Sequence, residues 1–399
     1  MFVDLSDGAS FADGFPHQFF KYLRDEHPVY WHKPTAHSPG GEGFWVVSRY
    51  DDAVAVMRDP QTFSSDKVPP RKGGGTGLND ENHAGFAINA SDDPQHKRLR
   101  GLVSQGFTPR HIAALETELR QRAKTILDRI SDPSDFEFMR EVARELPLQA
   151  ICSILGVPEE DRLELADWID QGLETPSEGV ISREHLLLVQ KYGQELIAEK
   201  RRRPGKDMLS DIVQARLEGE AETRLNALEL INFFLLLFPA GAETTRSAIG
   251  GGLLALIEHP DEMRKLRDNS ALMPLAVEEI VRWTTPSIYK RRTATRDTEL
   301  AGTPIKAGDK VSFWEMSANR DERAFAAPFK FDISRDPNPH VGFGTGIHIC
   351  LGMPLARMEL KIMFEELLAR FDSFELLASP KWMPNNRLHG VREMRICAR

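Results

Sequence analysis

Apolar residues recur every three or four positions through much of the chain, a spacing that places them on one face of an α-helix. This pattern predicts helices over residues 109–130, 138–155, 181–202 and 225–258. Two short apolar runs within residues 28–58 resemble strands and lead into a helix from Tyr50, and strand patterns return only after Thr285. We therefore expect one domain, residues 1–399, that is mainly α with a minor β region: a helical body over about 94–285 and β-rich parts at about 28–58 and within 285–399.

Residues 60–93 interrupt the periodic pattern. They contain Pro69, Pro70 and a run of glycines at 73–75, and this density of residues that break helices and strands predicts a long loop. Long loops in compact domains are often lids over a binding site. We call residues 60–93 the lid loop and expect it to serve that purpose.

The composition narrows the class of protein and the compartment. The 399 residues are 41% hydrophobic and 28% charged with a formal net charge of −9, which fits an ordinary globular protein and argues against nucleic-acid binding. Three cysteines are too few for a disulfide framework, so a reducing compartment is expected. The first residues carry neither a basic stretch nor an apolar run, and the longest apolar run, residues 231–242, is too short to span a bilayer. We therefore expect a cytoplasmic protein without a membrane anchor, in which residues 231–242 form a buried helix.

The strongest candidate for chemistry is Cys350, which follows a glycine-rich stretch at residues 342–346 and precedes a helical pattern over residues 355–371. Glycines adopt backbone conformations that other residues avoid, so amide groups of such a loop can converge on the sulfur. The N-terminal end of the following helix favours an anionic thiolate. A small buried cysteine in a turn is the alternative, and the loop argues against it.

A second candidate lies within the predicted helix 225–258, where Glu243 and Thr244 stand among apolar residues. Buried polar groups are costly unless they face water, a ligand or each other. A structural alternative fits the pattern equally well, because the threonine hydroxyl can bond to a carbonyl one turn earlier while the glutamate points to solvent. Pro239 removes a backbone N–H just before the pair and leaves the carbonyl of Leu235 without its helical partner, which predicts a kink or groove.

The stretch of residues 343–350 resembles the haem-binding signature of the cytochrome P450 family, in which an aromatic residue, two glycines, a basic residue and the cysteine recur at this spacing. The resemblance implies haem b, iron protoporphyrin IX, with Cys350 as the thiolate ligand of the iron and with Phe343 and Gly344 beside the cofactor. It also implies the cytochrome P450 fold, in which the haem lies between the long central helix and the helix after the cysteine.

The same resemblance assigns further roles. It implies that Thr244 positions a water or proton donor near the haem and that Glu243 helps to deliver protons, although many relatives have aspartate at the latter position. Buried haem propionates need cationic or hydrogen-bonding partners, and the residues at the matching family positions are His96, Arg100, Arg292 and His348. Taken singly, each of these four is compatible with an ordinary surface group.

Glu279 and Arg282 form an (i, i+3) pair on a predicted helix over residues 274–283. Such a pair is ordinarily an exposed bridge worth about 0.2–0.5 kcal/mol. The family carries Glu-x-x-Arg at this distance before the cysteine, together with an arginine in a Phe-rich loop, here Arg335. The resemblance therefore implies a buried structural network that stabilises the haem-binding core.

The resemblance implies a haem-thiolate monooxygenase that uses O2 to hydroxylate an apolar or amphipathic small molecule, such as a lipid, terpenoid, sterol or secondary metabolite. Residues 283–321 are similar to the soluble bacterial branch that includes sterol, terpenoid and branched-lipid hydroxylases. The chain has neither a flavin-binding glycine fingerprint nor a cysteine cluster for iron–sulfur, so electrons are expected from a ferredoxin and a ferredoxin reductase.

We expect a monomer with an apolar substrate pocket and a basic docking surface for the ferredoxin. The pocket is expected to involve the lid loop, helices within residues 155–205, and the side chains of Leu236, Ala240, Ile288 and Leu388. The docking surface is expected to consist of Lys97, Arg98, Arg357 and Lys361.

Three other functions stay open. Oxidative coupling, dehydration or another non-hydroxylating oxidation is compatible with the same residues. A non-catalytic haem-binding protein is disfavoured by the Glu243–Thr244 pair. A hydrolase with Cys350 as nucleophile would need a histidine and an orienting group, but His348 is only two residues away and no third group is evident.

Overall fold

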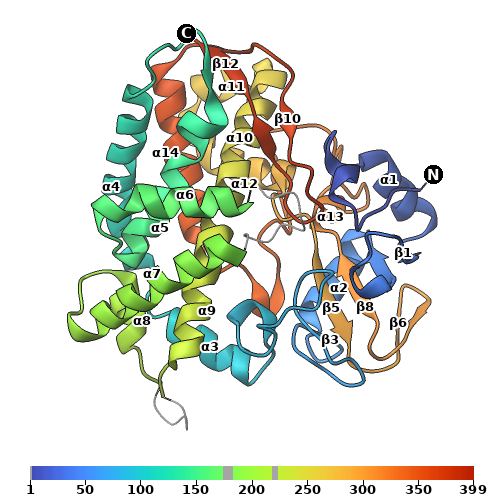
Figure 1. The fold of residues 1–399 in the computed structure, drawn as a ribbon. Coiled ribbons are helices and arrows are strands. Elements are labelled where there is room, and N and C mark those ends of the chain that lie inside the picture. The colour runs from blue at the N-terminus through green and yellow to red at the C-terminus, as the bar shows by residue number, and fades with distance from the viewer. Residues whose placement is uncertain (1, 174–182, 218–222) are drawn as a thin grey trace. The chain divides into compact units, whose positions relative to one another are not determined.

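The computed structural model describes residues 2–173, 183–217 and 223–399 of the chain (Figure 1). These residues divide into two compact units. The first unit comprises Met1–Asp92, Gly251–Cys350 and Lys381–Arg392, and the second comprises Asp93–Gly250, Leu351–Pro380 and Glu393–Arg399. Helices predominate over strands, so the prediction of a mainly α fold with a minor β region is confirmed.

The first unit contains a five-stranded sheet with strand order β1-β2-β8-β5-β3. In that order the strands are Val29–His32, Phe44–Val47, Lys310–Phe313, Lys290–Ala294 and Phe63–Ser64. The two strands expected within residues 28–58 are β1 and β2, which pair antiparallel, and β2 pairs with β8 in parallel. In Figure 1 the blue and orange strands of this sheet lie side by side, so the sheet joins segments that are far apart in the chain.

Aromatic packing fixes the N-terminal segment to this sheet. Trp314, which directly follows β8, is fully buried and stacks on Phe11 with ring centroids 6.2 Å apart. Its indole N–H donates to the Ser312 hydroxyl at 3.0 Å, which satisfies the one polar group of the side chain.

The first unit also contains five complete α-helices. They are α1 (His17–Glu26), α2 (Tyr50–Arg58), α11 (Pro260–Asp268), α12 (Met273–Thr284) and α13 (Glu315–Ala318). Two short hairpins complete the unit, β6 (Thr298–Leu300) with β7 (Thr303–Ile305), and β10 (Lys381–Trp382) with β11 (Val391–Glu393). The helix start at Tyr50 and the helix predicted over residues 274–283 are both confirmed.

The second unit is almost entirely helical. Its helices are α3 (Gln95–Val103), α4 (Pro109–Asp128), α5 (Glu145–Leu155), α6 (Arg162–Leu173), α7 (Arg183–Arg202), α8 (Met208–Gln214), α9 (Ala227–Phe238) and α14 (Met353–Arg370). The helix predicted over residues 138–155 is present as two elements, a π-helical turn, Met139–Ala143, and α5. The first two residues of the predicted helix 181–202 lie outside the described residues.

A small sheet in the second unit corrects one expectation. Its order is β4-β12-β9, and β4 (Phe136–Glu137) precedes Thr285, so the prediction that strands return only after Thr285 is wrong. A two-residue strand is too short to show alternation in the sequence. It forms because β12 (Arg395–Ala398) pairs with it and with β9 (Phe374–Leu376).

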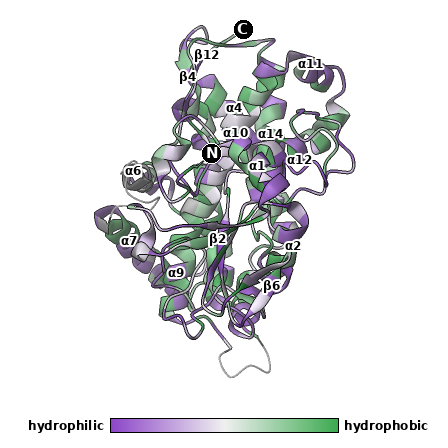
Figure 2. Ribbon diagram, turned by 90° about the vertical axis from the view of Figure 1, so that its right-hand side faces the viewer, coloured by the Kyte–Doolittle hydropathy of each residue, from purple (hydrophilic) through white to green (hydrophobic). Residues whose placement is uncertain are grey.

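The long apolar helix predicted over residues 225–258 is present but not uniform. α9, whose largely apolar residues are green in Figure 2, ends at Phe238 and a π-helical turn, Pro239–Glu243, precedes α10 (Thr244–Glu258). The predicted distortion after Leu235 therefore takes the form of a widened turn. The stretch Ala227–Glu258 is longer than the apolar run itself and could cross a membrane by length and composition, a test that the core helix of a soluble protein also passes.

Candidate active site

Cys350 ends a loop, residues 341–350, whose glycines are required by the backbone. Gly344 and Gly346 have positive φ values of 68° and 75°, a region that other residues rarely adopt. At Gly346 a Cβ would also come within 2.5 Å of the Met57 carbonyl oxygen. The backbone therefore requires glycine at these two positions.

Backbone hydrogen bonds within this loop fix the cysteine. The Gly344 N–H donates to the Val341 carbonyl at 2.8 Å, and the Cys350 N–H donates to the Phe343 carbonyl at 2.9 Å. α14 begins at Met353, two residues before the predicted start, so Cys350 lies just before its N-terminal end. A helix N-terminus favours an anionic sulfur.

Exposure distinguishes the three cysteines. Cys350 is exposed, whereas Cys152 and Cys397 are buried. Burial raises the pKa of the Cys152 thiol to about 12, which keeps it protonated near neutral pH. Cys350 is thus the cysteine whose sulfur is accessible to a ligand.

Arg292 on β5 fits an anionic partner. Its side chain is 4% exposed, lies over the Phe313 ring at 5.3 Å and donates to the Arg291 carbonyl at 2.9 Å. Burial lowers its pKa to about 10, although Asp92 and Glu315 oppose the shift. Within the described residues no carboxylate forms an ion pair with this guanidinium, so a carboxylate of a bound cofactor fits here. In the same unit, His348 Nε2 lies 3.3 Å from the Ser65 hydroxyl.

His96 and Arg100 lie four residues apart on α3 in the second unit. His96 is 2% exposed, and its Nδ1 lies 3.4 Å from Asp93 Oδ1. Residues four apart share one helix face, so both side chains can meet the same ligand. A histidine and an arginine are suitable donors for a propionate.

Arg98, on the same helix, corrects the predicted docking surface. Its guanidinium is 8% exposed and forms a buried ion pair with Glu229 of α9. Glu229 also accepts the Asn226 N–H at 2.9 Å, and its own N–H donates to Asn226 Oδ1 at 2.9 Å, which caps the start of α9. The expectation that Arg98 is a surface cation is therefore wrong, and its contact instead links α3 to α9.

Glu243 and Thr244 occupy the junction between the π-helical turn and α10. Thr244 Oγ1 donates to the Ala240 carbonyl at 2.6 Å, which is the back-bond that the structural alternative expects. Glu243 is 3% exposed and its Oε2 lies 3.5 Å from Arg246 Nη1, so the glutamate does not point to solvent. With its hydrogen engaged by Ala240, the Thr244 oxygen retains lone pairs that can only accept.

Glu279, Arg282 and Arg335 come together, as predicted. Glu279 and Arg282 are both fully buried and form a bidentate pair at 2.7 and 2.8 Å. Arg335 Nε donates to the same carboxylate at 3.1 Å, and the Asp332 N–H donates to it at 2.9 Å. The pair is therefore a buried network and not the exposed bridge that the spacing alone would suggest.

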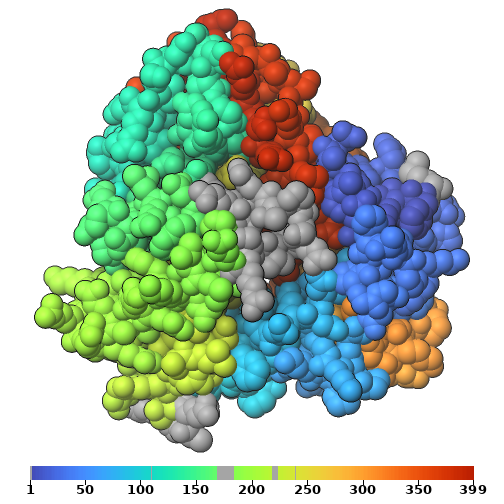
Figure 3. All heavy atoms as spheres, in the orientation of Figure 1, coloured from blue at the N-terminus to red at the C-terminus, as the bar shows by residue number. Residues whose placement is uncertain are grey.

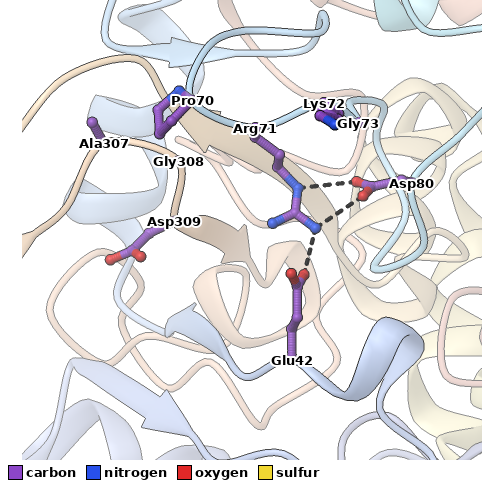
Figure 4. Close-up of a pocket in the computed structure, with 9 residues that line it drawn as sticks. All are labelled: Glu42, Pro70, Arg71, Lys72, Gly73, Asp80, Ala307, Gly308 and Asp309. Carbon is purple, nitrogen blue, oxygen red and sulfur yellow. Dashed lines mark hydrogen bonds and ion pairs between the residues drawn. The ribbon is translucent and has the colours of Figure 1, made fainter.

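The lid loop is tied to the sheet by charges. Arg71 forms ion pairs with Asp80 and Glu42 (Figure 4). Asp80 also accepts from the fully buried Arg291 of β5 at 2.9 Å, and Glu42 lies 3.1 Å from Lys310 of β8. These contacts connect the loop to two strands of the sheet, and in Figure 3 the light-blue surface of this segment adjoins the orange surface of the β6–β7 hairpin.

Hydrogen bonds to Glu81 hold the next turn of the lid loop. Glu81 accepts the Thr76 and Gly77 N–H groups and the Arg387 guanidinium at 2.9–3.0 Å. Burial would raise the pKa of Glu81, but His83, Arg387 and the Thr76 amide outweigh it and lower the pKa to about 2. Leu78 is buried in the aromatic core around Trp314. The loop is thus an ordered part of the first unit.

A pocket of about 470 Å³ lies beside the ion pairs that Arg71 forms with Asp80 and Glu42 (Figure 4). It is lined by Glu42, Pro70, Arg71, Lys72, Gly73, Asp80, Ala307, Gly308 and Asp309. Charged side chains dominate this lining, whereas pockets for small apolar molecules are mostly apolar. It is therefore distinct in character from the substrate pocket that the sequence predicts.

The predicted pocket residues differ in exposure. Ala240 is exposed and Leu236 and Leu388 are partly buried. Ile288 has no exposed surface and belongs to the aromatic core around Trp314. This placement does not support a lining role for Ile288, because its side chain is already covered by the protein.

Glu359 on α14 is a site that the sequence reasoning missed. It is 1% exposed, and no group within the described residues hydrogen-bonds its Oε2. Burial raises its pKa to about 8. The sequence pattern could have revealed this buried carboxyl group. Glu359 stands four residues from both Leu355 and Met363, on the apolar face of the predicted helix.

Glu359 should make stability depend on pH. The pKa of Glu359 in the folded protein lies above its ordinary value of 4.5. Its contribution to folding stability is therefore full below pH 4.5 and is lost as the pH rises toward 8. Each pKa unit corresponds to about 1.36 kcal/mol, so the loss at pH 7 is on the order of 3 kcal/mol. Glu359→Gln removes the ionisation, and its unfolding free energy should rise relative to wild type by that amount between pH 5 and 7. Glu160→Gln, at an exposed position of the same unit, is the control. Parallel pH profiles for wild type and Glu359→Gln would refute the burial argument.

Comparison with known proteins identifies the family. The family model for Cytochrome P450 matches residues 181–392. The chain is 49% identical over 398 residues to a Mycobacterium tuberculosis protein provisionally named cytochrome P450 126, covering 98% of this chain and 96% of that protein. It is 38% identical over 410 residues to the methyl-branched lipid omega-hydroxylase of M. tuberculosis and 37% identical over 409 residues to the steroid C26-monooxygenase of Rhodococcus jostii, covering 98% of this chain in both cases and 90% and 84% of those proteins.

A solved structure agrees with these relatives. The Mycobacterium marinum cytochrome P450 CYP268A2 in complex with pseudoionone superposes with a TM-score of 0.88 at 36% identity, covering 99% of this chain and 98% of that one. The protein therefore belongs to the cytochrome P450 family. It is an O2-dependent monooxygenase with haem b as its cofactor, of a bacterial branch that resembles lipid and steroid hydroxylases. This membership decides against the cysteine-hydrolase alternative.

Proposed function

We propose that this protein hydroxylates an apolar or amphipathic small molecule, such as a lipid, terpenoid, sterol or secondary metabolite, at a haem bound through the thiolate of Cys350. The observation that carries the proposal is the exposed position of Cys350 at the end of a loop that requires glycines, just before α14. The names of two relatives, a methyl-branched lipid hydroxylase and a steroid monooxygenase, support the substrate class.

The residues available for the cofactor match its chemistry. Cys350 would supply the thiolate ligand, with Phe343 and Gly344 in the same loop beside the cofactor, and the cofactor would supply the activation of O2. His96, Arg100, Arg292 and His348 would hold its propionates, and Arg292 is the best supported of them because it is buried without a carboxylate partner among the described residues. Glu279, Arg282 and Arg335 would stabilise the core that carries the loop.

The substrate and the type of oxidation can be tested together. A panel of fatty acids, branched lipids, terpenoids and steroids should contain compounds that shift the haem absorbance on binding. Turnover of a binding compound under labelled O2 should add one labelled oxygen atom to the product. A coupled or desaturated product without label would instead favour the alternative of a non-hydroxylating oxidation, and binding without any product would favour a haem-binding protein without turnover.

Thr244 is proposed to manage protons by accepting a hydrogen bond. Because its hydrogen is engaged by the Ala240 carbonyl, its oxygen can hold a water or another proton donor in place. Glu243 is proposed to deliver protons, and its contact with Arg246 keeps the carboxylate buried within the same helical segment.

Thr244→Ala is expected to leave haem content and substrate affinity near wild type while diverting electrons to hydrogen peroxide. General acid–base groups typically contribute about 10²- to 10⁴-fold, so the product formed per electron consumed should fall by a readily measured factor. Thr244→Ser keeps the hydroxyl and should retain most of the coupling. Wild-type coupling in Thr244→Ala would reject the role.

Electrons are proposed to come from a ferredoxin and its reductase. After the correction of Arg98, the candidate docking surface consists of Lys97, Arg357 and Lys361, and Lys361 Nζ lies 3.5 Å from Glu116 Oε1. A small acidic protein would be steered to such a surface by charge.

The double charge reversal Arg357→Glu with Lys361→Glu should slow reduction by ferredoxin on the order of tenfold at low ionic strength. The effect should shrink as salt rises, since screening weakens interactions between exposed charges. Substrate binding serves as the internal control and should not change. Reduction rates that respond neither to the substitutions nor to salt would place the docking surface elsewhere.

The remaining expectations are also proposals. We propose that residues 1–399 act as one haem domain, that the protein is a monomer, and that it is cytoplasmic. The match of relatives over 98% of the chain supports the first of these.

A further inference from the structure

Two side chains from outside the cysteine loop hold its first two residues, Val341 and Gly342, which we call the loop head. Asn319 follows α13, and His340 immediately precedes the loop. Asn319 Oδ1 accepts the Val341 N–H at 2.8 Å, and His340 Nδ1 accepts the Gly342 N–H at 3.2 Å. The two consecutive amides of the loop head are therefore satisfied by side chains and not by secondary structure.

Asn319 connects the loop head to the end of α12. It is fully buried, and its Nδ2 donates to Thr285 Oγ1 at 2.9 Å. Thr285 caps α12 in the left-handed region with φ 34°, and its hydroxyl donates to the Arg282 carbonyl at 2.8 Å. Arg282 in turn donates to the Asn319 carbonyl at 2.8 Å, which closes the ring of contacts.

His340 connects the loop head to the preceding turn of the same helix. Its side chain is 4% exposed, and its Nε2 lies 3.1 Å from Glu278 Oε2. A backbone N–H can only donate, so Nδ1 must be the unprotonated nitrogen and Nε2 carries the hydrogen that Glu278 accepts. Glu278 thereby fixes both the tautomer and the orientation of the ring.

Gly342 also lies directly on α12. A Cβ at this position would come within 2.8 Å of Val281 Cγ1 and 3.2 Å of the Val281 carbonyl oxygen. The close approach makes the loop head sensitive to small movements, because there is no free space on this side. The adjacent residues Glu278 and Glu279 thus have different partners. Glu278 orients His340, and Glu279 belongs to the buried network with Arg282 and Arg335.

We propose that Asn319 and His340 are positioning residues for the Cys350 thiolate. The proposal rests on the proposed function, in which Cys350 ligates haem. The Val341 carbonyl accepts the Gly344 N–H, and the Phe343 carbonyl accepts the Cys350 N–H. A displacement of the loop head would therefore reach the cysteine through these two hydrogen bonds. A displaced cysteine would hold the iron less firmly, so both the reduction potential and the rate of haem loss should change.

The test uses the haem-loaded protein with paired variants. His340→Phe keeps the ring shape without an acceptor, whereas His340→Asn places an amide oxygen near the position of Nδ1. Asn319→Leu removes both hydrogen bonds, whereas Asn319→Asp keeps the acceptor for Val341. Lys265→Met, which breaks contacts with Asp332 and Ser334 elsewhere in the first unit, is the control for general destabilisation.

The readouts are the reduction potential, the rate of haem transfer to an acceptor protein, and the absorption of the reduced carbon monoxide complex. His340→Phe and Asn319→Leu should shift the potential and speed haem loss on the order of 10- to 100-fold. His340→Asn and Asn319→Asp should recover most of both values. Lys265→Met should leave the potential unchanged.

Each outcome decides the proposal. The positioning proposal is overturned if all four variants have the same reduction potential and rate of haem loss as Lys265→Met. If the wild-type protein lacks the red-shifted absorption of a thiolate ligand, the proposed function fails instead. Should His340→Phe or Asn319→Leu fail to fold, the conservative variants decide together with Glu278→Leu, which removes the acceptor for His340 Nε2. A wild-type potential in both conservative variants and a shifted potential in Glu278→Leu supports positioning. A wild-type potential in Glu278→Leu as well would count against it.

Discussion

Replacing Glu279 by alanine is expected to lower the unfolding free energy by about 3–5 kcal/mol, since removing one partner of a buried ion pair leaves an uncompensated charge in the interior. Arg282 has no access to water, and its Nη1 already donates to the Asn319 and Pro328 carbonyls at 2.8 and 2.9 Å. The variant would also remove the hydrogen-bond acceptor of Arg335 Nε and of the Asp332 N–H, which both donate to the same carboxylate. Denaturant unfolding of the haem-loaded protein measures the change.

A second Glu/Asp–Arg pair with the same spacing provides the control. Asp261 and Arg264 are also three residues apart, but their side chains are 86% and 67% exposed. Asp261→Ala should therefore cost less than about 1 kcal/mol. Comparable losses in Asp261→Ala and Glu279→Ala would contradict the conclusion that burial sets the importance of the Glu279 network.

Replacing Cys350 by alanine is expected to abolish oxygenation entirely, because no other side chain in the loop can supply an anionic axial ligand. Cys152→Ala is the matched control, since its thiol is buried with a raised pKa of about 12 and cannot replace Cys350. Product formation from any substrate found in the ligand panel measures the loss. Turnover in Cys350→Ala at more than a trace would remove Cys350 from the catalytic centre.

Local patterns in the sequence predicted the elements that depend on neighbours along the chain. β2 spans Phe44–Val47 and α2 begins at Tyr50, as predicted, because alternation and the helical period are properties of short segments. The distortion at Pro239 was also predictable, since a missing N–H acts within one turn. The loop before Cys350 followed from glycines whose conformations no other residue adopts easily.

Features that depend on distant partners could not be predicted from the same patterns. Arg98 looked like a surface cation because its partner, Glu229, lies on another helix far along the chain. Ile288 looked like a pocket residue, but its side chain is fully buried in the aromatic core around Trp314. The contacts of Asn319 and His340 with the loop head were likewise invisible, since each joins segments whose proximity depends on the tertiary fold.

The central claim is that Cys350 binds haem iron as a thiolate, and the absorption spectrum of the reduced protein under carbon monoxide tests it most directly. The account predicts the red-shifted band that is diagnostic of a thiolate ligand in the wild type, in Cys152→Ala and in Cys397→Ala, and its loss in Cys350→Ala. A Cys350→Ala protein that binds haem and retains an unchanged red-shifted band would contradict the account.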